Sequence, residues 1–161
     1  MNTWDIERTC AFTGHRPERL ALPEEQVKEW LEAQIVHAAD EGYTDFITGM
    51  QRGVDLWAAE TVLKLIIKDR QIRLIAACAF RGMDEDWDLD WQERYYHVMT
   101  HAEWVYYISD HPDRRAYFAR NQWMVDRASR LIAVYTGAPG DTEETIEYAR
   151  KKERDIVFIE H

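Results

Sequence analysis

Three short loops of this sequence combine glycines with polar side chains of the kinds that bind phosphate. They span residues 13–17, 49–55 and 137–142. In the first loop Arg16 follows His15, and a guanidinium presents a planar set of donors that matches a phosphate group. An exposed turn with solvated charges is the alternative interpretation of this pair. The residue types therefore point to an anion site, provided that the fold brings the loops together.

The second and third loops each place two glycines before a helical segment. The second carries Gly49 and Gly53, and the third carries Gly137, Gly140 and Thr142. Glycine lets a backbone approach a ligand closely, and the start of a helix offers unpaired N–H groups and a positive dipole end to an anion. A threonine hydroxyl there can cap the helix or bind phosphate. Glycines are also ordinary turn residues, so each loop alone has a purely structural alternative.

Two carboxylates and one polar pair are candidates for the same site. Asp55 and Glu60 lie in a mostly apolar helical segment. A buried carboxylate needs a partner, which indicates contact with a sugar hydroxyl or a catalytic role. The alternatives are a helix-start charge for Asp55 and a surface position for Glu60. Arg120 and Asn121 accompany an apolar run, and periodicity does not decide whether they face solvent or the cleft.

The elements that must position these residues alternate along the chain. Strands are expected at residues 8–12, 45–48, 72–80, 104–108, 131–135 and 156–159, and helices at 23–41, 54–69, 117–128 and 142–153, with a further helix within 81–101. This order predicts crossover units and a parallel sheet. We expect one α/β domain over residues 1–161, Rossmann-like, with three α/β/α layers and a mainly parallel central sheet. Ligands bind such sheets beyond the carboxyl ends of the strands, where the three loops should lie.

Composition limits the classes of partner. The 161 residues carry a formal net charge of −10. A protein that grips nucleic acid usually presents a basic face, so the charge argues against a nucleic-acid partner, although arginines between residues 114 and 130 form a local basic cluster. The seven Trp and eight Tyr should lie in the core or in an interface, which leaves a homo-oligomer formed through an aromatic surface open.

The same composition suggests a cytoplasmic protein without a membrane contact. The apolar runs are far shorter than a spanning helix, and the first residues lack the pattern of a signal peptide. Cys10 and Cys78 lie in apolar runs and are expected to be buried free thiols. The acidic run 84–88 lacks the spacing of a calcium loop and indicates a solvated surface. We expect no metal and no cofactor.

Motifs of common reactions are missing from the sequence. It contains no Gly-x-Gly-x-x-Gly, no Walker loop and no Gly-x-Ser-x-Gly turn. The sequence therefore lacks the motifs that are typical of hydride transfer, ATP hydrolysis and esterase activity.

Four blocks taken together resemble a known family. They are Thr13-Gly14-His15-Arg16-Pro17, Gly49-Met50-Gln51-Arg52-Gly53-Val54-Asp55-Leu56-Trp57-Ala58-Ala59-Glu60, Arg120-Asn121-Gln122-Trp123-Met124-Val125-Asp126, and Gly140-Asp141-Thr142 before Ile146-Glu147-Tyr148-Ala149. Their order and spacing resemble the YpsA-like bacterial proteins of the SLOG superfamily, over nearly the whole chain. That superfamily groups the Smf/DprA DNA-processing proteins with the LOG-type nucleoside-monophosphate phosphoribohydrolases. The resemblance implies a Rossmann-like fold that binds nucleotide derivatives such as ADP-ribose.

The last glycine loop departs from the pattern of the relatives, which usually carry Gly-Gly-Thr there. Asp141 takes the middle position, and a carboxylate 4 Å from a phosphate costs on the order of 1–4 kcal/mol. Asp141 is expected instead to cap the following helix, with Glu144 completing a capping box. A phosphate would then rest mainly on residues 49–54. The loop is also shorter and poorer in glycine than the enzyme motif of the phosphoribohydrolases.

The residues and the resemblance support three hypotheses of function that use these loops, besides a scaffold whose aromatic surface mediates assembly. The first is binding of a nucleotide-derived, phosphate-bearing small molecule, with a sensor as one role. The second is an N-glycoside hydrolase acting on nucleoside monophosphates, with Asp55 or Glu60 as the catalytic carboxylate. The third is DprA-like handling of nucleic acid. The candidate ligand-binding residues are Thr13, Gly14, His15, Arg16, Gly49, Gly53, Asp55, Arg120, Asn121, Gly137, Gly140 and Thr142.

Overall fold

The centre of the molecule is a six-stranded sheet in which every neighbouring pair is parallel. The computed structural model describes residues 4–68 and 71–160. The strands are β1 (Thr9–Gly14), β2 (Asp45–Thr48), β3 (Arg73–Cys78), β4 (Trp104–Tyr107), β5 (Arg130–Tyr135) and β6 (Asp155–Glu160), in the spatial order β4-β3-β2-β1-β5-β6. This arrangement confirms the predicted Rossmann-like α/β class with a parallel sheet.

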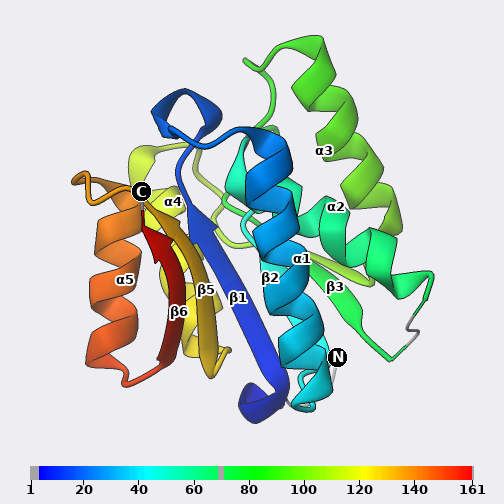
Figure 1. Cartoon of the computed structure of the whole chain (residues 1–161). Helices are drawn as coiled ribbons and strands as arrows, with labels where there is room; N and C mark the ends of the chain where they lie inside the picture. Colours follow the sequence, from blue (N-terminus) through cyan, green and yellow to red (C-terminus); the bar gives the residue numbers. More distant parts are fainter. Residues whose placement is uncertain (1–3, 69–70, 161) are drawn as a thin grey trace.

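Within the described residues, five α-helices cover the two faces of this sheet (Figure 1). They are α1 (Glu24–Asp40), α2 (Val54–Ile66), α3 (Leu89–His101), α4 (Arg114–Asp126) and α5 (Asp141–Lys151). Buried residues of α1, α2 and α3 share one core cluster, whereas most of those of α4 and α5 belong to the other. The molecule therefore has the three predicted layers.

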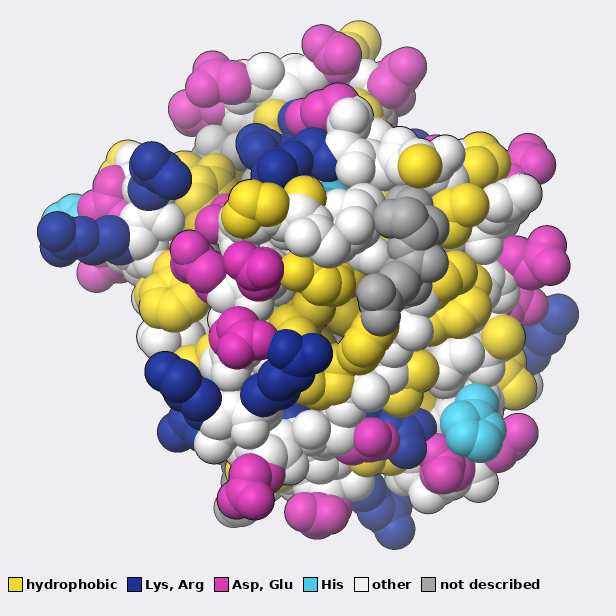
Figure 2. Space-filling view, turned by 60° about the vertical axis from the view of Figure 1, so that its left-hand side comes forward, with side chains coloured by type: hydrophobic (Ala, Val, Ile, Leu, Met, Phe, Trp, Pro, Cys, Tyr) yellow, Lys and Arg dark blue, Asp and Glu magenta, His cyan; other side chains and the backbone are white. Residues whose placement is uncertain are grey.

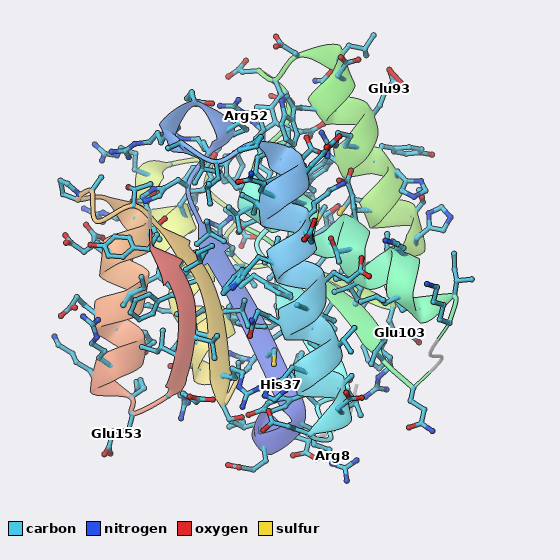
Figure 3. The ribbon with its side chains drawn as sticks, in the orientation of Figure 1. Arg8, His37, Arg52, Glu93, Glu103 and Glu153 are labelled. Atoms are coloured by element: carbon cyan, nitrogen blue, oxygen red, sulfur yellow. The ribbon has the colours of Figure 1, made fainter. Side chains whose placement is uncertain are left out.

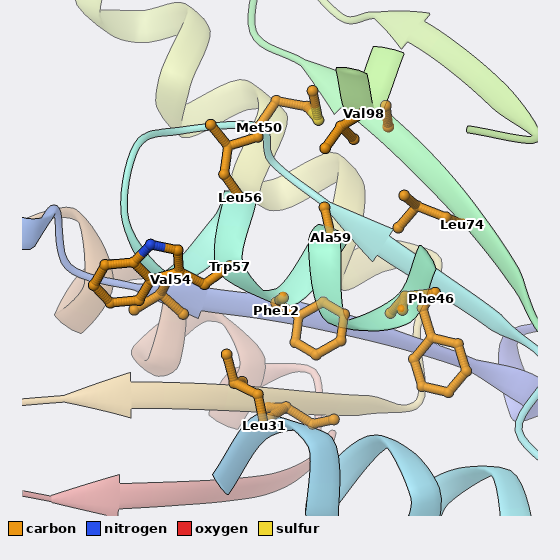
Figure 4. Packing of buried hydrophobic residues seen from close by; sticks show 14 of the residues in the cluster. Phe12, Leu31, Phe46, Met50, Val54, Leu56, Trp57, Ala59, Leu74 and Val98 are labelled. Carbon is orange, nitrogen blue, oxygen red and sulfur yellow. The ribbon is translucent and has the colours of Figure 1, made fainter. Parts of the chain in front are cut away.

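The alternation of side chains along each strand divides the core between these two clusters. Cys10 and Phe12 of β1 point toward α1 and α2, and Ala11 between them points toward α4 and α5. Phe46 and Ile47 of β2 divide in the same way. Figure 4 shows residues of the first cluster, among them Phe12 of β1, Leu31 of α1 and Leu56 of α2. Strands buried on both faces explain the continuous apolar runs of the sequence.

Element boundaries differ from the expected ones mainly at α4. The helix begins at Arg114, three residues before the predicted start, because Asp113 accepts a hydrogen bond from the Ala116 backbone N–H at 3.2 Å and caps it. The predicted helix 54–69 ends at Ile66 in the structure, and its expected last residue, 69, lies outside the described residues. Short 3-10 turns at Ile6–Arg8 and Pro17–Arg19 flank β1.

The strand order reverses between β1 and β5. The chain runs outward from β1 to β4, then crosses back to place β5 on the other side of β1. Such a point leaves a crevice at the carboxyl ends of the two strands, since their connections leave in opposite directions. In Figure 1 these ends lie at the upper edge of the sheet. The loops after β1 and β5 are two of the three that the sequence singles out.

Both cysteines are buried and free, as predicted. Among the described residues, no helix is both long and apolar enough to cross a membrane.

Candidate functional site

A pocket of about 480 Å³ opens at the carboxyl ends of the strands. Its volume is within the range of small-molecule sites. It is lined by Thr13, Gly14, His15, Arg16 and Arg19 from β1 and the turn after it, by Gln51, Arg52 and Asp55 around the start of α2, by Trp87 before α3, by Arg114, Tyr117, Arg120 and Asn121 of α4, and by Gly140, Asp141 and Thr142 at the start of α5. The pocket thus brings together the ligand-binding candidates except Gly49, Gly53 and Gly137.

Arginine dominates the charge of the pocket. Five of the lining residues are arginines, namely 16, 19, 52, 114 and 120, and two are carboxylates, Asp55 and Asp141. Glu18 lies beside two of these arginines. It accepts hydrogen bonds from both terminal nitrogens of Arg52, at 3.3 and 3.0 Å, and makes a longer ion pair of 3.9 Å with Arg16. Even with Glu18 counted, cations outnumber anions around the pocket.

Arg120 is the buried arginine of the group, with 4% of its surface exposed. Its Nη1 donates to the Gly49 carbonyl at 2.6 Å, and its Nε donates to Asn121 Oδ1 at 2.9 Å. These bonds use two of the five N–H groups that a guanidinium carries. A charge buried to this extent needs partners, and an anion in the pocket would supply a further one. The structure thus places Arg120 and Asn121 on the cleft side of α4.

Asp55 brings a titratable carboxyl to the same pocket. It is 6% exposed, and its Oδ2 accepts a hydrogen bond from the Gln51 backbone N–H at 3.3 Å. Burial raises the pKa of Asp55 to about 6, against the lowering effects of Arg120 and of the Gln51 N–H. A carboxyl of this pKa exchanges a proton near neutral pH, as a general acid or base must. Its ionised form accepts hydrogen bonds from sugar hydroxyls.

His15 joins the two strands at which the order reverses. Its Nε2 accepts a hydrogen bond from the Thr136 backbone N–H at 3.2 Å and lies 3.0 Å from the Thr136 hydroxyl. The imidazole also stacks on Tyr135, with ring centroids 6.0 Å apart. The His15 side chain thus fixes the loop after β1 to the end of β5.

The start of α5 differs from the predicted capping box. Gly140 takes the N-cap position, with φ of 141° and no side-chain cap, and Asp141 is the first helical residue. The predicted cap is therefore wrong, because Asp141 lies one position too late for its carboxylate to act as the N-cap. Thr142 is buried at the pocket, 4% exposed. Arg19 holds the loop from outside, with its Nη2 donating to the Pro139 carbonyl at 3.3 Å.

Three glycines predicted for ligand binding lie outside the pocket lining. A Cβ on Gly49 would lie 2.8 Å from Asp55 Oδ2 and 2.9 Å from Arg120 Nε, so this glycine makes room for two lining side chains. A Cβ on Gly53 would lie 2.7 Å from the His15 carbonyl. The close approach that these glycines permit is thus to the protein itself. Gly137 has φ of +90° and open space around it.

Glu60 lies on the far side of α2 from the pocket. Its carboxylate accepts hydrogen bonds from Arg94 Nε at 2.8 Å and Nη2 at 2.6 Å, and it pairs with Lys28 Nζ at 2.9 Å. These partners belong to α3 and α1. Glu60 therefore ties three helices together, and among the two candidate carboxylates only Asp55 reaches the pocket.

Several lining residues were not predicted from the sequence. They are Arg19, Gln51, Arg52, Trp87, Arg114, Tyr117 and Asp141. The spacing of Arg114, Tyr117, Arg120 and Asn121 follows a helical face, but that signal was hidden by the late predicted start of α4. Trp87 interrupts the acidic run assigned to a solvated surface. Figure 3 shows Arg52 at the upper edge of the molecule, beside the loop after β1.

The arginines between residues 114 and 130 do not form one basic patch. Arg114 and Arg120 line the pocket. Arg127 instead packs over the Trp123 ring, and Arg130 pairs with Glu41 and Asp155 at the other end of β5. Figure 2 shows a group of Lys and Arg side chains near the top of the molecule. The fold thus brings two arginines of the sequence cluster together with Arg16, Arg19 and Arg52 around the pocket.

Comparisons with known proteins agree with this fold. A family model described as the YspA SLOG family matches residues 10–160, which confirms the resemblance seen in the motifs. A UPF0398 protein of Bacillus cereus strain ATCC 14579 is 27% identical over 154 residues, covering 90% of this chain and 84% of the relative. A UPF0398 protein of Bacillus thuringiensis strain Al Hakam matches to the same extent.

Two solved structures of DNA processing protein A share the fold. The protein from Helicobacter pylori, described as having a unique single-stranded DNA binding mode, aligns with a TM-score of 0.67 at 16% identity. The protein from Streptococcus pneumoniae aligns with a TM-score of 0.64 at 15% identity. The chain covers 64% and 50% of their lengths, and they cover 93% and 94% of it.

This similarity contradicts the expectation against a nucleic-acid partner. That expectation used the net charge of −10, and a structural neighbour is a single-stranded DNA-binding protein. Net charge describes the whole surface, whereas binding depends on the charge at the site. Here the five pocket arginines make one local region positive within an acidic molecule.

Proposed function

The chain belongs to the YspA SLOG family, and on that basis we propose that its arginine-lined pocket binds a nucleotide-derived, phosphate-bearing ligand of the size of ADP-ribose or AMP. The observation that carries the proposal is the convergence of five arginines on one pocket at the point where the strand order reverses. Charge-assisted hydrogen bonds from guanidinium groups are the strong contacts of phosphate sites.

The helix starts around the pocket favour the same class of ligand. The first residues of α2, α4 and α5 are among or next to its lining residues. Helix starts attract anions through free N–H groups and the dipole. At α4, however, the sequence places Arg114 and Arg115 in the first turn and no acidic residue there. The N-cap carboxylate of Asp113 offsets part of the cost of cations at this helix start, and an anion bound beside the arginines would offset more.

Asp55 suits the sugar of such a ligand. It is the buried carboxyl next to the arginines, and an ionised carboxylate accepts hydrogen bonds from the paired hydroxyls of a ribose. Asn121 is buried on the same wall, and its amide oxygen already accepts from Arg120. On this proposal its NH₂ group donates to the ligand.

A hydrolase acting on the N-glycosidic bond is the second candidate. One observation favours it, namely the raised pKa of about 6 for Asp55, which suits proton exchange at neutral pH. Single-stranded DNA is the third candidate, because the structural neighbour from Helicobacter pylori binds it. Both candidates use the same pocket. The hydrolase would cleave its ligand after binding, whereas the DNA-binding protein would hold a longer ligand without cleaving it.

Calorimetric titration of the purified chain with ADP-ribose, AMP and adenosine tests the proposal. Binding of ADP-ribose and AMP at least about tenfold tighter than adenosine is expected, because one charge-assisted contact is worth roughly 1.5–3 kcal/mol. Equal affinities for all three ligands would refute a phosphate site. Release of free adenine from AMP, followed by chromatography, would identify the hydrolase, and its loss in Asp55→Asn would assign the carboxyl.

A further inference from the structure

Two aromatic rings stand out in a pocket that is otherwise mainly polar. Trp87 comes from the segment between β3 and α3, and Tyr117 comes from α4. Both are partly buried side chains that pack on the core from the pocket side. Part of each ring remains exposed. A large aromatic side chain that is partly exposed within a cleft is typical of a ligand contact.

Each of the two rings packs against a neighbouring aromatic ring. Trp87 makes an edge contact with Tyr95, with centroids 5.5 Å apart and planes at 86°. Tyr117 makes an edge contact with Phe80, with centroids 5.6 Å apart and planes at 77°. The turn that carries Trp87 is fixed as well, because Gln92 Nε2 donates to the Asp84 carbonyl at 2.9 Å. The rings are therefore preorganised for a flat partner.

The two rings lie at one end of the pocket. Phe80 closely follows β3, so its contact brings Tyr117 to the β3 end, where the Trp87 segment also begins. Arg16 follows β1 and the start of α5 follows β5, so both come from strands farther along the sheet. Since β2 and β1 separate β3 from β5 in the sheet, the aromatic and the α5 ends of the pocket are distinct.

Charge distinguishes these two ends. Trp87 is flanked by the carboxylates of residues 84, 85, 86 and 88, which disfavour a phosphate beside it. Arg16, Arg19 and Arg52 lie after β1 or before α2, while Arg114 and Arg120 lie on α4 with Tyr117 and not on the acidic segment that carries Trp87. An anion that enters the pocket is thus drawn toward β1 and away from Trp87, while an uncharged aromatic group is free to occupy the Trp87 end.

Resting on the proposed function, we infer that Trp87 and Tyr117 form a stacking site for the base of the ligand, with its phosphate directed toward the arginines that follow β1. The pocket therefore selects nucleotides over sugar phosphates of equal charge. Arg120 lies over the Tyr117 ring, 5.5 Å from guanidinium carbon to centroid, and so links the base end to the phosphate end.

AMP and ribose 5-phosphate are the matched pair of probes, because they share the sugar and the phosphate and differ in the base. The wild-type chain should bind AMP at least about fivefold more tightly, the lower limit for stacking of one base on an aromatic side chain. Tyr117→Leu and Trp87→Leu should each remove most of this preference while leaving the affinity for ribose 5-phosphate unchanged. Tyr117→Phe and Trp87→Phe keep a ring and should restore AMP binding.

Tyr96→Leu serves as the control, because this tyrosine is 70% exposed on α3 and lies outside the pocket lining. It should bind both probes like the wild type. Equal wild-type affinities for AMP and ribose 5-phosphate, or parallel losses of both in the Leu variants, would overturn the stacking site and leave the phosphate site standing. Failure of the wild type to bind either probe would overturn the proposed function and the stacking site together.

Discussion

Arg16 is a pocket arginine with a weak hold on the protein itself. Its side chain is 50% exposed, and its ion pair with Glu18 spans 3.9 Å. Pairs of this kind contribute about 0–1 kcal/mol, so the guanidinium can turn toward a ligand at little cost. A contact between Arg16 and a phosphate would then be stronger than the contact between Arg16 and Glu18.

Arg16→Ala should weaken binding of ADP-ribose at least about tenfold, which corresponds to about 1.4 kcal/mol. Arg16→Lys should recover only part of the loss, since a point charge does not reproduce bidentate geometry. Calorimetric titration gives both values. Arg115→Ala is the control, because Arg115 is exposed and lies outside the pocket lining. Equal Kd values for Arg16→Ala and Arg115→Ala would show that the first loop does not bind the phosphate.

Asp55 makes the stability of the protein depend on pH. Burial raises its pKa from 3.8 to about 6 on folding. The folded chain thus binds this proton more tightly than the unfolded chain, and the resulting stabilisation is complete below about pH 4 and is lost as pH rises through about 6. About two pKa units correspond to ~3 kcal/mol at 1.36 kcal/mol per unit.

Asp55→Asn keeps the shape of the protonated side chain and removes the titration. The variant should match the wild type near pH 4 and be more stable by up to ~3 kcal/mol near pH 7. Urea unfolding of both proteins at intervals across this range measures the difference. Other carboxyl groups titrate alike in both chains and cancel. Parallel stability curves would contradict a raised pKa for Asp55.

At the scale of elements, Gly53 fixes how α2 meets the loop after β1. It is the N-cap of α2 with φ of 91° and ψ of −130°, a region that side chains rarely adopt. A Cβ there would also lie 2.7 Å from the His15 carbonyl. Gly42 has a similar φ of +103° with nothing within 4 Å, so it shares the backbone strain and lacks the contact.

Gly53→Ala should therefore destabilise the chain by at least about 1 kcal/mol more than Gly42→Ala, the lower end of the cost of forcing an atom into a packed site. Chemical denaturation of the two variants and the wild type gives both losses. If the two substitutions cost the same, the loop after β1 moves freely away from α2, and the contact described for Gly53 does not constrain the pocket.

Glu60 acts on the arrangement of helices rather than on the pocket. Glu60→Gln should lower the free energy of unfolding by about 1–3 kcal/mol, because Arg94 and Lys28 lose a charged partner in a partly buried site. The Kd for ADP-ribose should stay within about twofold of the wild type. Glu32→Gln is the matched control, since its pair with Lys64 is exposed and worth under about 1 kcal/mol. A large loss of ADP-ribose binding in Glu60→Gln would show instead that Glu60 takes part in ligand binding.

The sequence predicts the elements well where hydrophobic periodicity is strong. Alternating strands and helices, and runs buried on both faces, specify the parallel sheet and its layers. The lining of the pocket is less predictable, because the point at which a helix begins decides which of its residues line the pocket. Asp113 caps α4, so the helix begins at Arg114, and Arg114 and Tyr117 both line the pocket from it. Glycine marks a close approach, yet the sequence does not say whether ligand or protein approaches, as Gly53 illustrates.

At the scale of the whole molecule, charge is separated rather than balanced. The chain carries −10, yet the pocket has more cations than anions. An acidic surface with one basic pocket repels a long polyanion everywhere except at that pocket. The expectation against a nucleic-acid partner was wrong because it used the net charge of the whole chain and not the charge at the pocket. If the chain binds single-stranded DNA, the third candidate function, this separation of charge predicts that the pocket alone holds the strand.

A strand held by the pocket alone should gain no affinity from added length. A basic groove that follows the backbone would instead bind longer strands more tightly and with a steeper salt dependence, because each added phosphate releases counterions. We therefore expect oligothymidylates of about 4, 8 and 16 nucleotides to bind this chain with similar affinity per site, with equal salt slopes, and to be displaced by ADP-ribose. Fluorescence anisotropy at low and moderate salt, with and without ADP-ribose, measures all three properties. Affinity and salt slope that rise together with length, and resist ADP-ribose, would locate the strand on a surface other than the arginine-lined pocket.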